Sequence, residues 1–483
     1  MRRTSMGILV SLVACALCLS ACTQPSGGPS QAPSQVASSG STAPSPAALT
    51  LQWSGAYGGS AMDGFNSTAL LPDGGVIAVG ATCSDDGEFP RSHATDSRPT
   101  DCHDAVVAQF SASGSMVWAR VYGGTGDDFF SSVAVASDGT IYAVGSTTSA
   151  DGDFVAHSDS SASSVKQGAA LVVKFSSSGD IIWAKLMGGE VANSFTSVAV
   201  TPDGDVVAGG NTFSSTGDLP KKTGAASSPV LVKLTGAGTL VWADALGGTG
   251  VSGFGDSLMA IAVGPSGDVV VVGASSSDDG DFPREYHVNS ASNASFSDAF
   301  IASISADGLV DWSRVFGGTS VDISVSVSVT PAGDVYVAGS TWSSDGDFRS
   351  QATRSDGQTP FVACFSAGGT MAWIRTYVTD DDTWFKSIAA LSDGGAVVAG
   401  FVNQTPPAQE SAVSLGAVMQ IGSDGAVVGS GIVQDMPTSV IASVTVANAS
   451  EVFAAGMSSQ TAPSGDIDGT NINWDALITK FNL

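Results

Sequence analysis

The chain has 483 residues and a formal charge of -27, with 18 basic against 45 acidic residues. Proteins that hold nucleic acid by its phosphates need clustered Lys and Arg, so this composition argues against nucleic acid as a partner. Only 13% of the residues are charged and 59 are Gly, which predicts a chain rich in turns and poor in exposed helix.

Residues 1–21 have the layout of a secretory signal peptide. Arg2 and Arg3 precede an apolar run at 8–19, which is too short to span about 30 Å of hydrocarbon. The run ends in LSAC at 19–22, which resembles the lipobox of bacterial lipoproteins. The resemblance implies cleavage before Cys22, lipid such as palmitate on that cysteine, and an extracytoplasmic protein anchored to the cell membrane. An ordinary secretory signal with a chance cysteine is the alternative.

Residues 22–47 form a Pro/Ser/Gly-rich segment that cannot bury enough apolar surface to fold. We expect it to be a lipid-anchored linker. A flexible chain of this length would hold the folded part about 25 to 30 Å from the membrane.

One phrase recurs through residues 48–483. Each copy has four short apolar segments separated by Gly or Asp-Gly turns, which in the second copy lie at 131–136, 140–147, 169–175 and 180–186. The outer-strand phrase occurs seven times, six times with a tryptophan and the seventh time with Gly429 in its place. The tryptophans are Trp53, Trp118, Trp183, Trp242, Trp312 and Trp373. Four antiparallel strands in each of seven copies predict an all-β fold, a seven-bladed β-propeller.

The two ends of the repeat region are complementary. It begins at 49–59 with LTLQWSGAYGG, which matches the fourth, outermost strand of the other copies. It ends at 475–481 with DALITKF, which matches their third strand. The last copy therefore lacks its own fourth strand. If 49–57 pairs beside 475–481, the ring closes and neither partial sheet leaves an exposed edge.

The repeat phrase GG(T/S)…D…VAV…DG…GST…DGDFP resembles that of the bacterial seven-bladed β-propeller repeat family (SBBP type), found in secreted and surface proteins. The resemblance implies the fold but no common chemistry. Other sequences replace DGDFP at 403–411 and 459–469. The phrase G-x-x-x-W also resembles the tryptophan-docking phrase of quinoprotein dehydrogenases, which implies indoles packed between blades, but the adjacent cysteines of a quinone enzyme do not occur.

Cysteines and histidines suggest a disulfide more strongly than a metal site. Cys83 and Cys102 flank one loop, and a disulfide between them would contribute about 3 kcal/mol in an exported protein. Cys364 is expected to be an unpaired thiol. The histidines fall in loops that join second to third strands, with no zinc-ligand spacing. They are His93, His103, His157 and His287.

Two series of acidic residues are candidate sites. The recurring S-x-DGDF phrase could offer oxygens to calcium, the one cofactor suggested here, or form Asp-Gly turns that pin each loop while the Phe packs between blades. Its carboxylates are Asp85, Asp86, Asp278, Asp279, Asp281, Asp345 and Asp347.

The second acidic series precedes the innermost strands. It comprises Asp63, Asp128, Asn193, Asp322, Asp382 and Asp435. Ring symmetry would bring these side chains to one mouth of the central channel, where they would bind a cation or cap backbone amides at the strand entries.

No copy contains the convergent titratable groups that catalysis needs, so no catalytic residue is predicted. The favoured function is a monomeric, membrane-tethered propeller that binds a protein or glycan ligand through the face carrying its long loops. A glycan-acting hydrolase or lyase and an envelope-assembly scaffold are the alternatives. Trp, Tyr and Arg are enriched at binding hot spots, which selects Arg91, Arg98, Arg284, Tyr286, Trp342 and Arg354 on that face.

Overall fold

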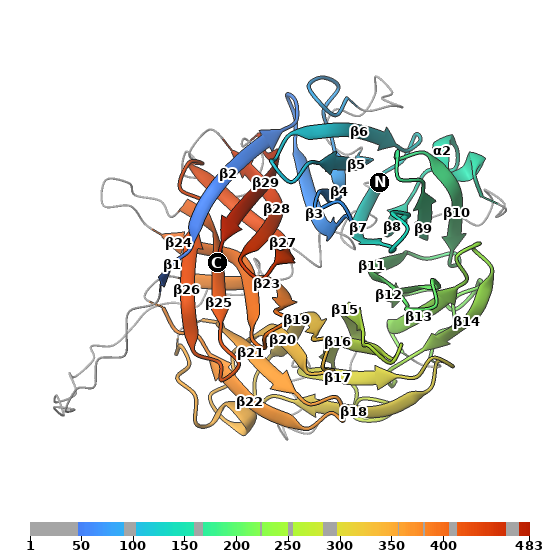
Figure 1. Ribbon diagram of the computed structural model, residues 1–483. Helices are drawn as coiled ribbons and strands as arrows, with labels where there is room; N and C mark the ends of the chain where they lie inside the picture. The colour runs from blue at the N-terminus through green and yellow to red at the C-terminus, as the bar shows by residue number, and fades with distance from the viewer. Residues whose placement is uncertain are drawn as a thin grey trace, which may run out of the picture.

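The computed structural model describes residues 47–90, 103–158, 168–222, 225–249, 255–283, 297–355, 357–379, 382–404, 413–459 and 473–483. These residues form seven sheets arranged as a ring around a central channel, so the predicted all-β, seven-bladed propeller is confirmed (Figure 1). Within the described ranges, helix is confined to α2 (Gly152–Ala156) and η2 (Gly346–Phe348). None of the described helices has the length and apolar character needed to cross a membrane.

The blades are numbered in chain order and their strands run from the channel outward. Blade 1 consists of β3 (Asp63–Leu70), β4 (Val76–Thr82), β5 (Asp104–Phe110) and β6 (Met116–Tyr122). Blade 2 consists of β7 (Asp128–Val135), β8 (Ile141–Thr147), β9 (Ala169–Phe175) and β10 (Ile181–Met187). Blade 3 consists of β11 (Asn193–Val200), β12 (Val206–Thr212), β13 (Ser228–Leu234) and β14 (Leu240–Ala245). Blade 4 consists of β15 (Ser257–Val263), β16 (Val269–Ser275), β17 (Asp298–Ile304) and β18 (Val310–Phe316).

The last three blades follow the same order. Blade 5 consists of β19 (Asp322–Val329), β20 (Val335–Thr341), β21 (Thr359–Phe365) and β22 (Met371–Thr376). Blade 6 consists of β23 (Asp382–Ala390), β24 (Ala396–Gln404), β25 (Val413–Ile421) and β26 (Val427–Ile432), with β1 (Ala47–Ala48) added outside. Blade 7 consists of β27 (Thr438–Asn448), β28 (Glu451–Ser459), β29 (Asp475–Asn482) and β2 (Thr50–Tyr57).

Burial explains the strand sequences. The two middle strands of a blade face a neighbouring blade on each side, so they are continuous apolar runs such as VIAVGAT in β4. The outermost strands are partly exposed and carry mixed side chains, as in β6. The core is divided among the blade junctions: Ile77 and Val107 of blade 1 share one cluster with Phe130 and Val173 of blade 2.

A ring of hydrogen bonds joins neighbouring innermost strands. Each of these strands has a β-bulge, and the residue after the bulge is a serine in six blades. The Ser67 hydroxyl accepts a hydrogen bond of 3.2 Å from the backbone N–H of Val133 in the next blade. Ser132, Ser197, Ser326, Ser387 and Ser443 make the equivalent bond. Ala260 occupies this position in blade 4 and has no hydroxyl to offer.

The ring closes through the two ends of the repeat region. Strand β2 pairs antiparallel with β29, with Leu51 opposite Phe481 and Ala56 opposite Leu477. In Figure 1 the blue β2 accordingly lies beside the red β29. The predicted pairing of 49–57 with 475–481 is therefore confirmed.

The structure explains why Gly429 replaces the tryptophan in blade 6. Strand β1 pairs parallel with β26, with Ala47 opposite Gly429. The following Leu49 is buried, and a Cβ added to Gly429 would lie 2.8 Å from Leu49 Cδ2 and 3.0 Å from the Ala47 carbonyl oxygen. The N-terminal segment thus fills the space that a side chain would need.

We expect Gly429→Trp to destabilise the protein by about 3 kcal/mol or more, because overpacking at this site must also displace Leu49. Chemical denaturation would measure the loss. Val428→Trp is the matched control, since Val428 is the preceding residue and is 45% exposed. Equal stability of the two variants would contradict this account of the missing tryptophan.

Candidate functional site

Strand direction sorts the connections onto two faces. Turns between first and second strands and between third and fourth strands are short, as at 136–140 and 176–180 in blade 2. We call their side the short-turn face. Second strands end and third strands begin on the opposite side, the long-loop face, as at Thr147 and Ala169, and crossovers between blades, such as 188–192, lie there too.

A repeated set of hydrogen bonds fixes the base of the long loops. After β2 the crossover begins with Gly58, whose N–H donates to the Glu88 carboxylate at 3.0 Å and whose carbonyl accepts the Glu88 N–H at 3.1 Å. The Ser60 N–H donates to Asp86 at 2.7 Å. These bonds connect the crossover to the first long loop, and we call the arrangement the crossover clamp.

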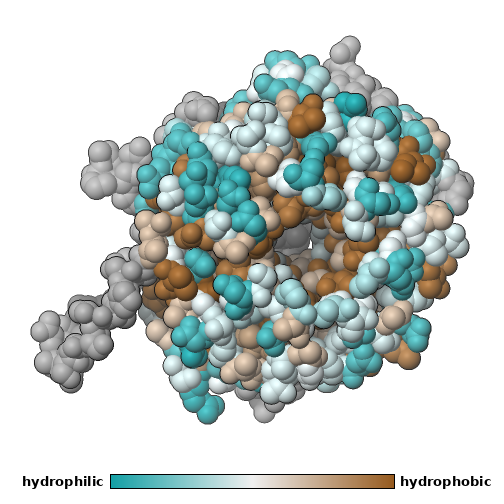
Figure 2. All heavy atoms as spheres, in the orientation of Figure 1, coloured by the Kyte–Doolittle hydropathy of each residue, from teal (hydrophilic) through white to brown (hydrophobic). Residues whose placement is uncertain are grey.

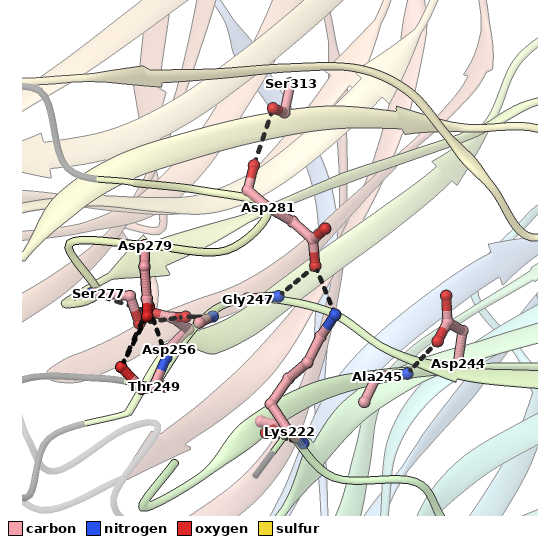
Figure 3. A network of polar contacts seen from close by, with 12 residues as sticks. Lys222, Asp244, Ala245, Gly247, Thr249, Asp256, Ser277, Asp279, Asp281 and Ser313 are labelled. Carbon is pink, nitrogen blue, oxygen red and sulfur yellow. Dashed lines mark hydrogen bonds and ion pairs between the residues drawn. The ribbon is translucent and has the colours of Figure 1, made fainter. Parts of the chain in front are cut away.

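Blades 1 to 5 carry a crossover clamp. The acidic residue that exchanges two hydrogen bonds with the first crossover glycine is Glu88, Asp153, Asp218, Asp281 or Asp347. Figure 3 shows the copy in blade 4, where Asp281 binds Gly247 and Asp279 binds Thr249. Lys222 adds an ion pair to Asp281 at 3.1 Å.

A glycine at the centre of each clamp permits the close approach. Gly87 has φ +77°, and a Cβ added there would lie 1.8 Å from the Gly58 carbonyl oxygen. Gly152, Gly217, Gly280 and Gly346 stand equally close to their crossovers. The S-x-DGDF phrase is therefore a backbone-packing motif.

The aromatic residue of the phrase enters the core. Phe89, Phe154, Phe282 and Phe348 are buried, and Phe89 meets Phe65 edge to face with ring centroids 5.8 Å apart. This matches the turn interpretation of the phrase. No group of three or more His, Cys, Asp or Glu side chains could hold a metal ion in the described part of the chain. In blade 4, Asp279 and Asp281 bind different parts of the crossover instead of converging on one point.

The second acidic series is largely internal. Asp63, Asp128 and Asp322 are fully buried, and Asn193 is almost so. In Asp128 one carboxylate oxygen accepts the Gly124 N–H at 2.9 Å and the Ser149 hydroxyl at 2.6 Å. These side chains therefore cap the crossover backbone inside the protein, and they present no open carboxylates at a channel mouth.

The structure corrects the membership of this series in three blades. Counted from the β-bulge, the matching positions in blades 6 and 7 are Thr383 and Ser439, not Asp382 and Asp435. Asp382 accepts a hydrogen bond from the Trp384 indole, and exposed Asp435 accepts one from the Ser54 hydroxyl. Blade 4 contributes Asp256, which accepts the Gly248 N–H at 2.7 Å. Four additional crossover residues in blade 4 hid Asp256, whereas the ten-residue interval from Trp53 to Asp63 recurs from Trp373 to Thr383 and from Gly429 to Ser439.

The tryptophans pack between blades, as the docking phrase implies. The Trp53 ring lies against Gly114 in the third-to-fourth turn of the next blade. The Trp373 indole N–H donates to the Ser423 carbonyl at 2.8 Å, and Trp242 makes the equivalent bond to Ala306 at 3.0 Å. The indoles serve as blade contacts and leave no cofactor platform.

Two of the predicted ligand-binding residues lie in described parts of the long-loop face. Trp342 and Arg354 are both half-buried there, in the second-to-third connection of blade 5. Other predicted residues lie outside the described residues: Cys22, Arg91, His93, Arg98, Cys102, Arg284, Tyr286 and His287. Their assigned roles stay predictions.

Cys83 faces a histidine across the blade. Thr82 pairs with Asp104, so the strand register continues with Cys83 opposite His103. Burial lowers the pKa of His103, but hydrogen bonds and charges from Asp127 and Cys83 outweigh it and raise that pKa to about 10. Cys83 is a free thiol, and the disulfide to Cys102 stays a prediction. Cys364 is a free, buried thiol.

No protein-family model matches the chain, and no curated protein matches it. Solved structures share its overall shape at low identity. The WD40 domain of Pan2 from Neurospora crassa is 8% identical, with a TM-score of 0.47 over 90% of this chain and 97% of that one. The structure of YCF48 bound to D1 peptide is 9% identical, with a TM-score of 0.44 over 90% of this chain and 99% of that one.

The propeller domain of the trilobed protease from Pyrococcus furiosus is 6% identical, with a TM-score of 0.43 over 86% of this chain and 95% of that one. These likenesses carry no inference about activity.

The clamp makes a specific prediction about glycine substitutions. Gly87→Ala should destabilise the protein by roughly 1–2 kcal/mol more than Gly74→Ala, as measured by denaturant unfolding. Both residues have positive φ, but a Cβ at Gly74 meets no atom within 4 Å, whereas one at Gly87 meets the Gly58 carbonyl. Equal losses would mean that backbone strain alone matters and that the clamp contact does not.

The buried aspartates predict an unusual pH dependence. Burial raises the pKa of Asp128 and of Asp322 to about 7 against hydrogen bonds that lower it. Because the pKa of each aspartate is higher in the folded state, its protonated form stabilises the folded protein. This stabilisation is fully present at pH values below the unfolded-state pKa near 4, and it is lost as the pH rises through the folded-state pKa of about 7. Each site contributes at most about 4 kcal/mol.

We therefore expect the free energy of unfolding to fall between about pH 4 and pH 7, and to fall less in Asp128→Asn/Asp322→Asn. Asn193 shows that an amide fits this position. Asp307→Asn, in an exposed turn, is the control. An identical pH profile of the double variant and the wild type would contradict the assignment.

Proposed function

We propose that this protein is a membrane-tethered extracytoplasmic propeller that binds a protein or glycan ligand through its long-loop face. The crossover clamp is the observation that carries the proposal. It uses two hydrogen bonds to the first crossover glycine at each of five blades, and it holds the start of each long loop against the preceding crossover. Loops on a rigid scaffold are the usual place for recognition.

The long loops beyond these clamps carry varied sequences. The chain repeats its scaffold phrase while the connections differ in length and composition, so one scaffold carries different side chains from blade to blade. In blade 5, Trp342 precedes the clamp residues, Arg354 follows them, and both are partly exposed. Both residue types contribute strongly to binding where they become buried by a partner.

The point where the N-terminal segment joins the ring suits a tether. Strand β1 adds to the outer edge of blade 6, away from the central channel. A linker that joins the ring at its rim leaves both faces accessible. Lipid on Cys22 would then hold the ring near the membrane while a ligand binds.

An enzymatic role receives less support from the described residues. A glycosidase needs two carboxyl groups about 5 to 9 Å apart beside a substrate cleft. On this face, clamp carboxylates such as Asp279 and Asp345 bind backbone N–H groups of the crossovers, which describes a structural role. Binding without chemistry is therefore the better interpretation.

Site-specific photo-crosslinking on intact cells would test the binding face. A photoreactive residue at exposed Ser344, beside Trp342, should capture one defined partner, and Trp342→Ala should reduce the yield at least fivefold. The same residue at exposed Ser113, on the short-turn face, is the matched control. Capture of that partner from position 113, or an unchanged yield with Trp342→Ala, would contradict the assigned face.

The anchor has its own test. Cys22→Ser removes the lipidation site, so the variant should move from the membrane fraction to the soluble fraction, because a single linker and an acidic propeller offer no other stable anchor. Immunoblotting of cell fractions measures the shift, with Cys364→Ser as the control. Retention of the Cys22→Ser variant in the membrane fraction would exclude the lipid anchor.

A further inference from the structure

We propose that the channel mouth on the short-turn face is a second binding site, which takes a basic protein segment that inserts an aliphatic side chain. This site lies opposite the long-loop face, so it does not depend on the function proposed above. Three features define it: a ring of aliphatic side chains, a cavity within that ring, and an acidic rim.

The aliphatic ring is fixed by strand register. In blades 1 to 6 the first strand reaches the short-turn face with an apolar residue that pairs with the opening residue of the second strand, as Val135 pairs with Ile141. In blade 7 the corresponding Val446 pairs with Val452, the second residue of β28. All seven are only half-buried. They are Leu70, Val135, Val200, Val263, Val329, Ala390 and Val446. We call this set the throat.

A cavity of about 470 Å³ occupies the throat at blades 2 to 5. It is lined by the four throat valines and by three prolines of the adjoining turns, Pro202, Pro265 and Pro331. The size falls in the range of protein binding pockets. Hydrophobic residues surround the central opening, with hydrophilic residues outside them (Figure 2).

Acidic residues surround the throat. Each of the seven turns that join first to second strands carries or ends in a carboxylate, and we call the set the collar. It comprises Asp73, Asp138, Asp203, Asp205, Asp268, Asp334, Asp393 and Glu451. Repetition of the same charge around one mouth creates a negative potential there.

Few cations offset the collar. Among the described residues, the salt bridges to it come from Lys233, 3.6 Å from Asp203 and 3.4 Å from Asp205, and from Lys480, 3.0 Å from Glu451. Hydrogen bonds from Thr140 are the main cause of the lowered pKa of Asp138, and the Lys174 charge lowers it further, while the Lys174 amino group donates to the Gly236 carbonyl. Most of the collar charge is therefore available to an incoming cation.

These features select the occupant. An anionic membrane surface would be repelled by the collar. A glycan usually stacks on aromatic rings, and the residues that line the cavity include none. An apolar throat inside a negative rim is instead complementary to a segment with a Leu, Ile or Val between Lys or Arg residues, because the aliphatic chain loses water and the cations meet carboxylates.

The test uses a fluorescein-labelled peptide, Lys-Lys-Gly-Leu-Leu-Gly-Lys-Lys, and the full chain in fluorescence anisotropy titrations. We expect saturable binding that weakens at least tenfold when Gly replaces both Leu residues, and at least tenfold when Glu replaces every Lys. Higher salt should weaken it as well, because the contacts to the collar are exposed.

Variants locate the site. Val200→Lys/Val263→Lys should abolish binding by filling the throat with like charge, and Asp138→Asn/Asp268→Asn/Asp334→Asn should weaken it at least fivefold. The second variant changes only turn side chains, so it keeps the test valid if the first fails to fold. Trp342→Ala, on the opposite face, should leave the affinity unchanged.

Four results would overturn the proposal. The first is absence of saturable binding up to about 1 mM peptide, a concentration that corresponds to a binding free energy of only about 4 kcal/mol. The second is undiminished peptide binding by the collar variant, and the third is equal binding of the Gly-substituted peptide. The fourth is that the protein binds phosphatidylglycerol vesicles in preference to the peptide. Loss of peptide binding in Trp342→Ala would place the peptide on the long-loop face, which overturns this site and leaves the proposed function intact.

Discussion

Closure of the ring by β2 is the constraint on which the other contacts depend. Each blade buries the faces of its middle strands only against its neighbours, so an open arc would leave two large apolar faces exposed. The chain avoids this by sharing one blade between its ends: Leu51 and Ala56 of β2 pair with Phe481 and Leu477 of β29, about 420 to 430 residues later in the sequence. A serine bond also crosses this junction, because the Ser443 hydroxyl of blade 7 accepts the Thr68 N–H of blade 1.

Repetition made the fold predictable. Features that recur with the repeat, such as the strand pattern, the tryptophan and the Phe of S-x-DGDF, have the same role wherever they occur, and the sequence predicted that role for each. The complementary end phrases were equally informative, because a missing fourth strand can be supplied only from elsewhere in the chain. These predictions needed only local spacing and the two-residue alternation of strands.

The candidate site was only partly predictable, because acidic residues stand near the matching position in blades 6 and 7 and blade 4 has four additional crossover residues. Asp382 and Asp435 precede innermost strands as Asp63 does, yet the bulge register places Thr383 and Ser439 at the matching positions. The ten-residue interval from the tryptophan position to Asp63 recurs at Thr383 and Ser439, so counting from that position identifies them. Gly429 was visible as an exception, but its reason, contact with Leu49, joins segments far apart in the chain. The throat was missed because Val135 and its counterparts resemble ordinary core residues.

Blade 3 shows how one substitution changes the crossover chemistry. Where an aspartate accepts hydrogen bonds from a crossover N–H and a serine hydroxyl, Asn193 uses its amide to donate to the Val191 and Gly168 carbonyls. Ser214, whose counterpart in blade 2 binds Asp128, turns to the Thr216 carbonyl instead at 2.9 Å. A carboxylate only accepts, whereas an amide also donates, so Asn193 binds the Val191 carbonyl of the crossover while its Oδ1 accepts the Thr212 hydroxyl. The ring tolerates this because each crossover is bonded within its own junction, and chemical variation there leaves the remaining blades unchanged.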